Sequence, residues 1–65
     1  MFAVMYMEGG KLHKEFGITL WKTEEKAHDM VDWILDACGG MSLEEFNSRD
    51  IAEFQRIEVM EIEGR

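Results

Sequence analysis

The sequence is poor in cysteine and has no long apolar run. Cys38 is the only cysteine among 65 residues, which excludes an intramolecular disulfide and a cysteine-built zinc site and fits a reducing compartment. The apolar segment Met1 to Met7 has no basic flank and ends at Glu8, so we expect no signal peptide. No apolar run approaches the length of about 20 residues that is needed to span a bilayer. We therefore expect a cytoplasmic protein that does not bind a membrane.

Basic residues are also scarce. Seven of them stand against 14 acidic residues, which gives a net charge of −7. The excess is spread along the chain, with −3 over residues 1–40 and −4 over residues 41–65. Such a field repels phosphate backbones, so we expect no direct binding to nucleic acid.

Repeats, low-complexity stretches and linkers are absent from the sequence. A chain of 65 residues has room for one small core, and 46% hydrophobic beside 32% charged residues is typical of a folded protein. We expect a single domain that covers residues 1–65.

The first third of the chain predicts a β-hairpin. Met1 to Met7 is apolar at both parities, as in a central strand covered on both faces. Gly9-Gly10 can form the turn. The second strand, Lys11 to Trp21, alternates one set, Phe16, Ile18 and Leu20, against another, Gly17, Thr19 and Trp21. Its start, Lys11 to Glu15, is polar except for Leu12 and can be a frayed or exposed end.

A long amphipathic helix follows. Thr23 is a good N-cap, Glu24 and Glu25 suit a helix N-terminus, and Gly39-Gly40 can end the helix. Between them an apolar stripe recurs at helical spacing: Ala27, Met30, Val31, Ile34, Leu35 and Cys38.

The remainder predicts a short helix and a strand. Ser42 to Glu45 fits a capping box, and the helix it opens either ends near Asn47 or continues to Phe54. Gln55 to Glu63 is β-like, and its apolar phase changes between Val59 and Met60. That change suggests a bulge or a strand covered on both sides.

These elements predict an α+β fold. The sheet has three strands in the order 2-1-3, with the first strand central and antiparallel to both neighbours, and the long helix covers one face. The short helix can cover part of the other face. Whatever it leaves open is an apolar patch of the kind that marks a dimer or partner surface. The residues expected on or near that patch are Ala3, Met5, Met7, Trp21 and Met60.

Catalytic, metal and cofactor sites are not predicted. His28 and Asp32 stand at i, i+4 on the helix, but two ligands do not make a zinc site. Cys38 belongs to the apolar stripe, which indicates a buried, unreactive thiol, and His13 lies in a polar segment that favours a solvent-facing side chain. Neither glycine pair has the spacing of a phosphate-binding loop. We expect a protein that is not an enzyme.

The long helix and the last strand are rich in carboxylates, for which two interpretations remain. Helical spacing places four on one face and three more follow on the last strand: Glu25, Asp29, Asp32 and Asp36, then Glu58, Glu61 and Glu63. They can imitate the phosphates of a nucleic acid inside a basic channel, or they can keep a small protein soluble and protect the sheet edge. Trp33 beside the stripe and Trp21 are either interface anchors or core-edge residues.

Four features of the sequence form a recognisable pattern: the hairpin, the helix start at Thr23-Glu24-Glu25 with Ala27, the stop at Gly39-Gly40, and the closing strand Glu58 to Glu63. In this pattern the chain resembles short bacteriophage-encoded proteins. Several of those are acidic ββαβ domains that bind and inhibit a host enzyme, such as RNA polymerase or a defence nuclease. The chain departs from that pattern by adding Met41 to Phe54. The resemblance implies an accessory inhibitor in the host cytoplasm.

Two hypotheses follow. In the first, the chain is a viral, non-enzymatic protein that blocks a host nucleic-acid-handling enzyme through its acidic face and an apolar patch. In the second, it is a structural module that forms a homodimer through the uncovered sheet face around Met5, Met7 and Trp21.

Overall fold

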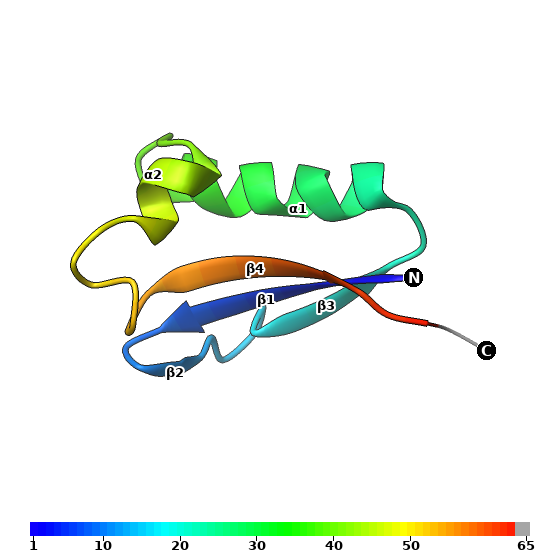
Figure 1. The fold of residues 1–65 in the computed structure, drawn as a ribbon, viewed down its shortest axis with the longest axis horizontal. Helices are drawn as coiled ribbons and strands as arrows, with labels where there is room; N and C mark the ends of the chain where they lie inside the picture. The colour runs from blue at the N-terminus through cyan, green and yellow to red at the C-terminus, as the bar shows by residue number, and fades with distance from the viewer. Residues whose placement is uncertain (64–65) are drawn as a thin grey trace.

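The sheet is built around its first strand, β1 (Phe2–Glu8). In the computed structural model, which describes residues 1–63, β1 pairs antiparallel with β4 (Arg56–Glu61) along one edge. Along its other edge it pairs with β3 (Ile18–Trp21) and β2 (Lys11–Leu12). The predicted order, with the first strand between the hairpin partner and the last strand, is confirmed (Figure 1).

The second strand of the hairpin is interrupted: Lys11 and Leu12 pair with β1, and a loop separates them from β3, where a frayed or exposed start over Lys11 to Glu15 was predicted. The Tyr6 carbonyl accepts from the His13 N–H at 2.9 Å, and the Tyr6 N–H donates to the Gly17 carbonyl at 2.9 Å. One residue of β1 thus bonds to both ends of a loop. The His13 Nδ1 atom closes the loop by accepting from the N–H groups of Glu15 and Phe16 at 3.1 and 3.0 Å. Only glycine fits at position 17, because a Cβ atom there would lie 2.6 Å from the His13 carbonyl oxygen.

The long helix follows its sequence signals closely. α1 spans Glu24–Ala37, and the Thr23 hydroxyl accepts from the Lys26 N–H at 3.2 Å, as an N-cap does. Gly39 and Gly40 adopt φ of +109° and +78°, which lets the chain leave the helix. α2 (Leu43–Asn47) begins at Ser42, whose hydroxyl accepts from the Glu45 N–H at 3.1 Å. It ends at the earlier of the two predicted positions. Neither helix in residues 1–63 is long and apolar enough to cross a membrane.

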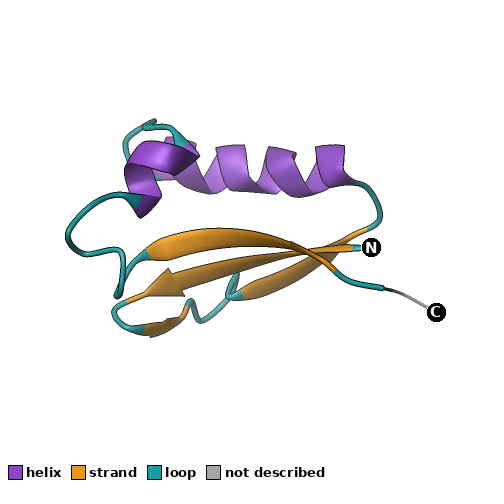
Figure 2. Ribbon diagram, viewed as in Figure 1, coloured by secondary structure: helices purple, strands orange, loops and turns teal. Residues whose placement is uncertain are grey.

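Both helices lie on the same face of the sheet (Figure 2). Val4, Tyr6 and Ile57 point from the sheet into the core, and Phe46 of α2 is fully buried among them. The helix α1 contributes its stripe of buried side chains: Ala27, Val31, Ile34 and Leu35. The prediction that the short helix covers part of the opposite face is therefore wrong, because burying Phe46 draws α2 onto the face that α1 already covers. The opposite face stays open.

The phase change in the last strand has a simple cause. β4 keeps one unbroken register with β1 from Arg56 to Glu61, so the predicted bulge is absent from this strand. Ile57 and Val59 pack toward the helices, whereas Met60 pairs with Ala3 on the other face and remains 42% exposed. The strand is thus not covered on both sides either. Its two apolar phases belong to two different environments, one buried and one open.

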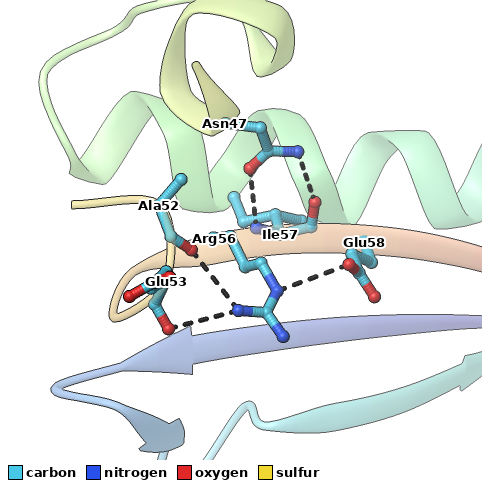
Figure 3. Close-up of polar contacts among 6 residues, drawn as sticks. All are labelled: Asn47, Ala52, Glu53, Arg56, Ile57 and Glu58. Atoms are coloured by element: carbon cyan, nitrogen blue, oxygen red, sulfur yellow. Dashed lines mark hydrogen bonds and ion pairs between the residues drawn. The ribbon is translucent and has the colours of Figure 1, made fainter. Parts of the chain in front are cut away.

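A side chain takes the place of a neighbouring strand at the outer edge of β4 (Figure 3). The Asn47 Nδ2 group donates to the Ile57 carbonyl at 2.7 Å, and the Ile57 N–H donates to the Asn47 Oδ1 atom at 3.0 Å. Asn47 is the last residue of α2. The same amide therefore satisfies two backbone groups of a buried residue and ties α2 to the sheet.

Replacing Asn47 with alanine should lower the free energy of unfolding by about 1–3 kcal/mol, because both backbone groups of Ile57 lose their partner. Urea denaturation would measure the loss. Ser48→Ala is the matched control, since the Ser48 hydroxyl bonds only to the exposed Glu44 carbonyl within α2. Equal stability of the Asn47→Ala variant and the control would contradict this role of the amide.

Candidate binding surfaces

The uncovered face is the side of the sheet that points away from both helices. Strand pairing arranges it in three rows: Leu20, Ala3 and Met60; Ile18, Met5 and Glu58; Leu12, Met7 and Arg56. Leu20 and Ile18 are 59% and 57% exposed, and Leu12 and Met60 are also exposed. The Ile62 N–H donates to the Met1 carbonyl at 2.8 Å, so the alternation of β1 and β4 brings these two exposed apolar residues to the same face.

The sequence placed most of the predicted apolar residues correctly but not Trp21. Met5, Met7 and Met60 lie on the uncovered face, as expected. Trp21 pairs with Phe2 and packs against the core on the covered face, where its Nε1–H donates to the Thr19 hydroxyl at 2.8 Å. The uncovered residues of that strand are Ile18 and Leu20.

A single ion pair interrupts the apolar character of this face. The Arg56 Nε atom lies 3.3 Å from a Glu58 carboxylate oxygen, and Figure 3 shows the two side chains along β4. The Arg56 guanidinium also donates to the carbonyls of Ala52 and Glu53 at 3.4 and 3.2 Å. Its position is therefore fixed by the preceding turn as well as by Glu58. The three rows carry one positive and one negative charge.

The acidic row comprises Glu25, Asp29, Asp32 and Asp36 on α1. All four are exposed, and helical spacing puts them opposite the buried stripe, on the side of α1 that points away from the sheet. Glu58 lies on the uncovered face, at the other side of the molecule. Glu61 is the last residue of β4 and Glu63 follows the strand, and both are exposed. The structure therefore separates the seven carboxylates that the sequence grouped together.

Four aromatic rings form a row at one edge of the core. Tyr6 stacks on His13 with ring centroids 5.0 Å apart, and His13 stacks on Phe16 at 5.4 Å. Phe16 meets the 56% exposed Trp33 edge-on at 5.2 Å. Together with Cys38, the row lines a groove of about 250 Å³. Trp33 thus lies at the core edge with one side in solvent. His13 is half-buried within the row, where a solvent-facing side chain was predicted.

Sequence patterns gave no signal for this aromatic row, because it depends on the loop between β2 and β3 folding toward α1. Within it, the Tyr6 hydroxyl donates to a Glu8 carboxylate oxygen at 2.8 Å and lies 3.6 Å from the Cys38 sulfur. Burial raises the pKa of Tyr6, and the hydrogen bonds to Cys38 and Glu8 raise it further because they favour the protonated phenol. Cys38 packs against the core and is partly buried.

Metal ligands do not converge in residues 1–63, where no three His, Cys, Asp or Glu side chains form a group that could hold a metal ion. His28 is directed toward Glu24, with its Nε2 atom 3.7 Å from a carboxylate oxygen. Asp32 lies with His28 along a shallow groove between α1 and α2.

Comparison of the chain with protein-family models, curated proteins and solved structures finds no match. The resemblance to phage inhibitors therefore stays a prediction.

Tyr6 is the single tyrosine, so its ionisation can be followed by phenolate absorbance. We expect the folded protein to titrate well above the value near 10 of a free tyrosine, and the urea-unfolded protein to titrate near 10. A pKa of Tyr6 that is higher in the folded than in the unfolded state stabilises the fold. This stabilisation is complete below about pH 10 and is lost as pH rises through the folded pKa. Tyr6→Phe supplies the blank. Phenolate absorbance that appears near pH 10 in both states would contradict the buried, hydrogen-bonded phenol.

Proposed function

We propose that this chain is a non-catalytic protein-binding module and that the uncovered face is its binding surface. The observation that supports it is the concentration of exposed apolar side chains on one side of the sheet. Nine large hydrophobic residues are exposed in residues 1–63, and six of them lie on this face: Met1, Leu12, Ile18, Leu20, Met60 and Ile62. Such a distribution differs from the single scattered residues that every protein surface shows.

The size of the patch supports the same proposal. Each of these side chains is about half exposed, so together they present apolar surface on the order of 400 Å², within the range in which the largest patch on a monomer is often functional. The face is made of regular strands rather than of loops, so it is preorganised and little conformational entropy is lost on binding. A partner that covers it would remove water from side chains that the fold itself leaves open.

Substituting Ile18 and Leu20 together by serine should abolish partner binding. Both side chains are more than half exposed, so the double variant should keep the fold. The wild-type and variant chains would be immobilised and challenged with the purified chain and with bacterial lysate, followed by mass spectrometry. We expect the wild type to retain a protein that the variant loses, with retention persisting in high salt because the contact is apolar. Identical capture by both chains would show that this face is not the binding surface.

A second candidate function uses the acidic row: inhibition of a host nucleic-acid-handling enzyme by a viral protein. Neither of the two ion pairs within residues 1–63 involves Asp29, Asp32 or Asp36, so their charges are available to a partner. The row places one charge about every 5 Å along α1, against one per about 3.4 Å along a DNA strand. A basic channel built for phosphates could accept this spacing.

The triple substitution Asp29→Lys, Asp32→Lys and Asp36→Lys should abolish capture of such an enzyme from bacterial lysate. Wild-type capture should weaken with added salt and with duplex DNA as competitor, because both compete for the same basic groups. The Ile18→Ser/Leu20→Ser variant is the control, since it leaves the acidic row intact. Capture that survives the triple substitution, or that ignores salt and DNA, would exclude the mimic.

A further inference from the structure

We infer that the partner of the uncovered face is a second copy of this chain, which forms a two-fold dimer with the two sheets packed face to face. This inference rests on the proposed function, in which that face binds protein. It adds the identity of the partner and the geometry of the complex. Three features of the described residues support it: the charge of the face, the position of the other charges and the size of the face.

The uncovered face is electrically neutral on a strongly anionic protein. The three rows that define it contain one cation, Arg56, and one anion, Glu58, already paired at 3.3 Å, while the whole chain carries −7. A basic partner would find no surplus of carboxylates on this face, and an acidic partner no surplus of cations. The best match for an apolar and neutral surface is another apolar and neutral surface, and each copy of the chain presents one.

Face-to-face packing also keeps the acidic rows apart. Each row lies on the side of α1 that points away from the sheet, so a dimer is a stack of helix, sheet, sheet and helix with a row on each outer surface. At about 10 Å per layer the two rows are about 40 Å apart, several times the Debye length of about 8 Å at physiological ionic strength. The net charge therefore opposes this dimer only weakly.

The outer edge of β4 is a poorer site for self-association. Asn47 already occupies both outward backbone groups of Ile57. Pairing two β4 strands would also bring Glu58, Glu61 and Glu63 of both copies along one seam, where like charges repel. The face offers apolar contact without either obstacle.

The area of the face predicts a weak but specific dimer. β1 and β4 have seven and six residues, and β2 and β3 together have six. With strands about 4.8 Å apart, each face covers about 300 Å² in projection, so two faces together bury on the order of 600–1,000 Å² of accessible surface, the size of weak, transient interfaces. Two sheets can pack in this way with their strands about 30° apart, as in a β-sandwich. We therefore expect a dissociation constant in the micromolar range.

Sedimentation equilibrium of the purified chain, from about 1 to about 500 µM, brackets the expected affinity. The mass should rise from 7.6 kDa toward twice that value, and high salt should leave the equilibrium unchanged or favour the dimer. Leu20→Lys and Met60→Lys should each weaken dimerisation at least about tenfold, because each buries an unpaired charge. Asp32→Asn on the acidic row changes the net charge by the same amount and should have no effect. Circular dichroism would show that the variants are folded.

Three outcomes would overturn the dimer. A mass of 7.6 kDa at every concentration would exclude it; the capture experiment on Ile18→Ser/Leu20→Ser would then show whether the face binds a different protein or none. A dimer lost in Leu20→Lys but retained in Met60→Lys would indicate pairing through the β3 edge, because these residues flank Ala3 on opposite sides. A dimer that dissociates in Asp32→Asn would place the interface on α1.

Discussion

β1 forms hydrogen bonds along both edges and has apolar side chains on both faces. A strand of this kind needs a layer on each side of the sheet, yet the chain supplies helices for only one. α1 covers Val4 and Tyr6, and α2 lies in the same layer, where its Phe46 is fully buried in the core. The second face is therefore apolar because β1 has apolar side chains on that side too, and it is open because no helix packs on it. This imbalance between a two-sided strand and a one-sided helical layer determines where everything else lies.

The distribution of charge follows from the same imbalance. α1 must turn its stripe of Ala27, Val31, Ile34 and Leu35 toward the sheet, so the carboxylates at the complementary helical positions point outward. The apolar and the acidic surfaces are thus on opposite sides of a thin, two-layer molecule. A single flat partner surface cannot touch both. An inhibitor that used the two together would need a partner that wraps around the edge of the domain, whereas separate partners for the two surfaces need no such geometry.

Local signals predicted the parts of the fold that depend on local chemistry. The N-cap at Thr23, the cap at Ser42 and the stops at Gly39 and Gly40 were all read correctly, because each is a backbone bond or dihedral set by a neighbouring residue. The sheet order followed from the apolar character of β1. The features that were missed depend on contacts between distant segments. The bond of Asn47 to Ile57 and the loop that stacks His13 on Tyr6 have no periodicity to detect. The assignment of Trp21 failed because the more apolar parity of its strand, Ile18 and Leu20, is the one that stays open, while Trp21 packs against the core. Tertiary packing, not local hydrophobicity, decides which set is buried.

The two surfaces need not compete for one role. Covering the uncovered face with a second copy removes the apolar patch from solvent and leaves both acidic rows exposed, pointing in opposite directions. If one row bound a basic channel weakly, two rows on one particle could engage two sites, and the second contact would form at the effective concentration set by the dimer rather than at that of the bulk solution. This gain in affinity requires two basic sites on the partner that face each other across the dimer. The layer spacing of packed sheets and helices puts them about 40 Å apart. A single deep channel offers no such pair, so the dimer would favour partners that are themselves two-fold or repetitive.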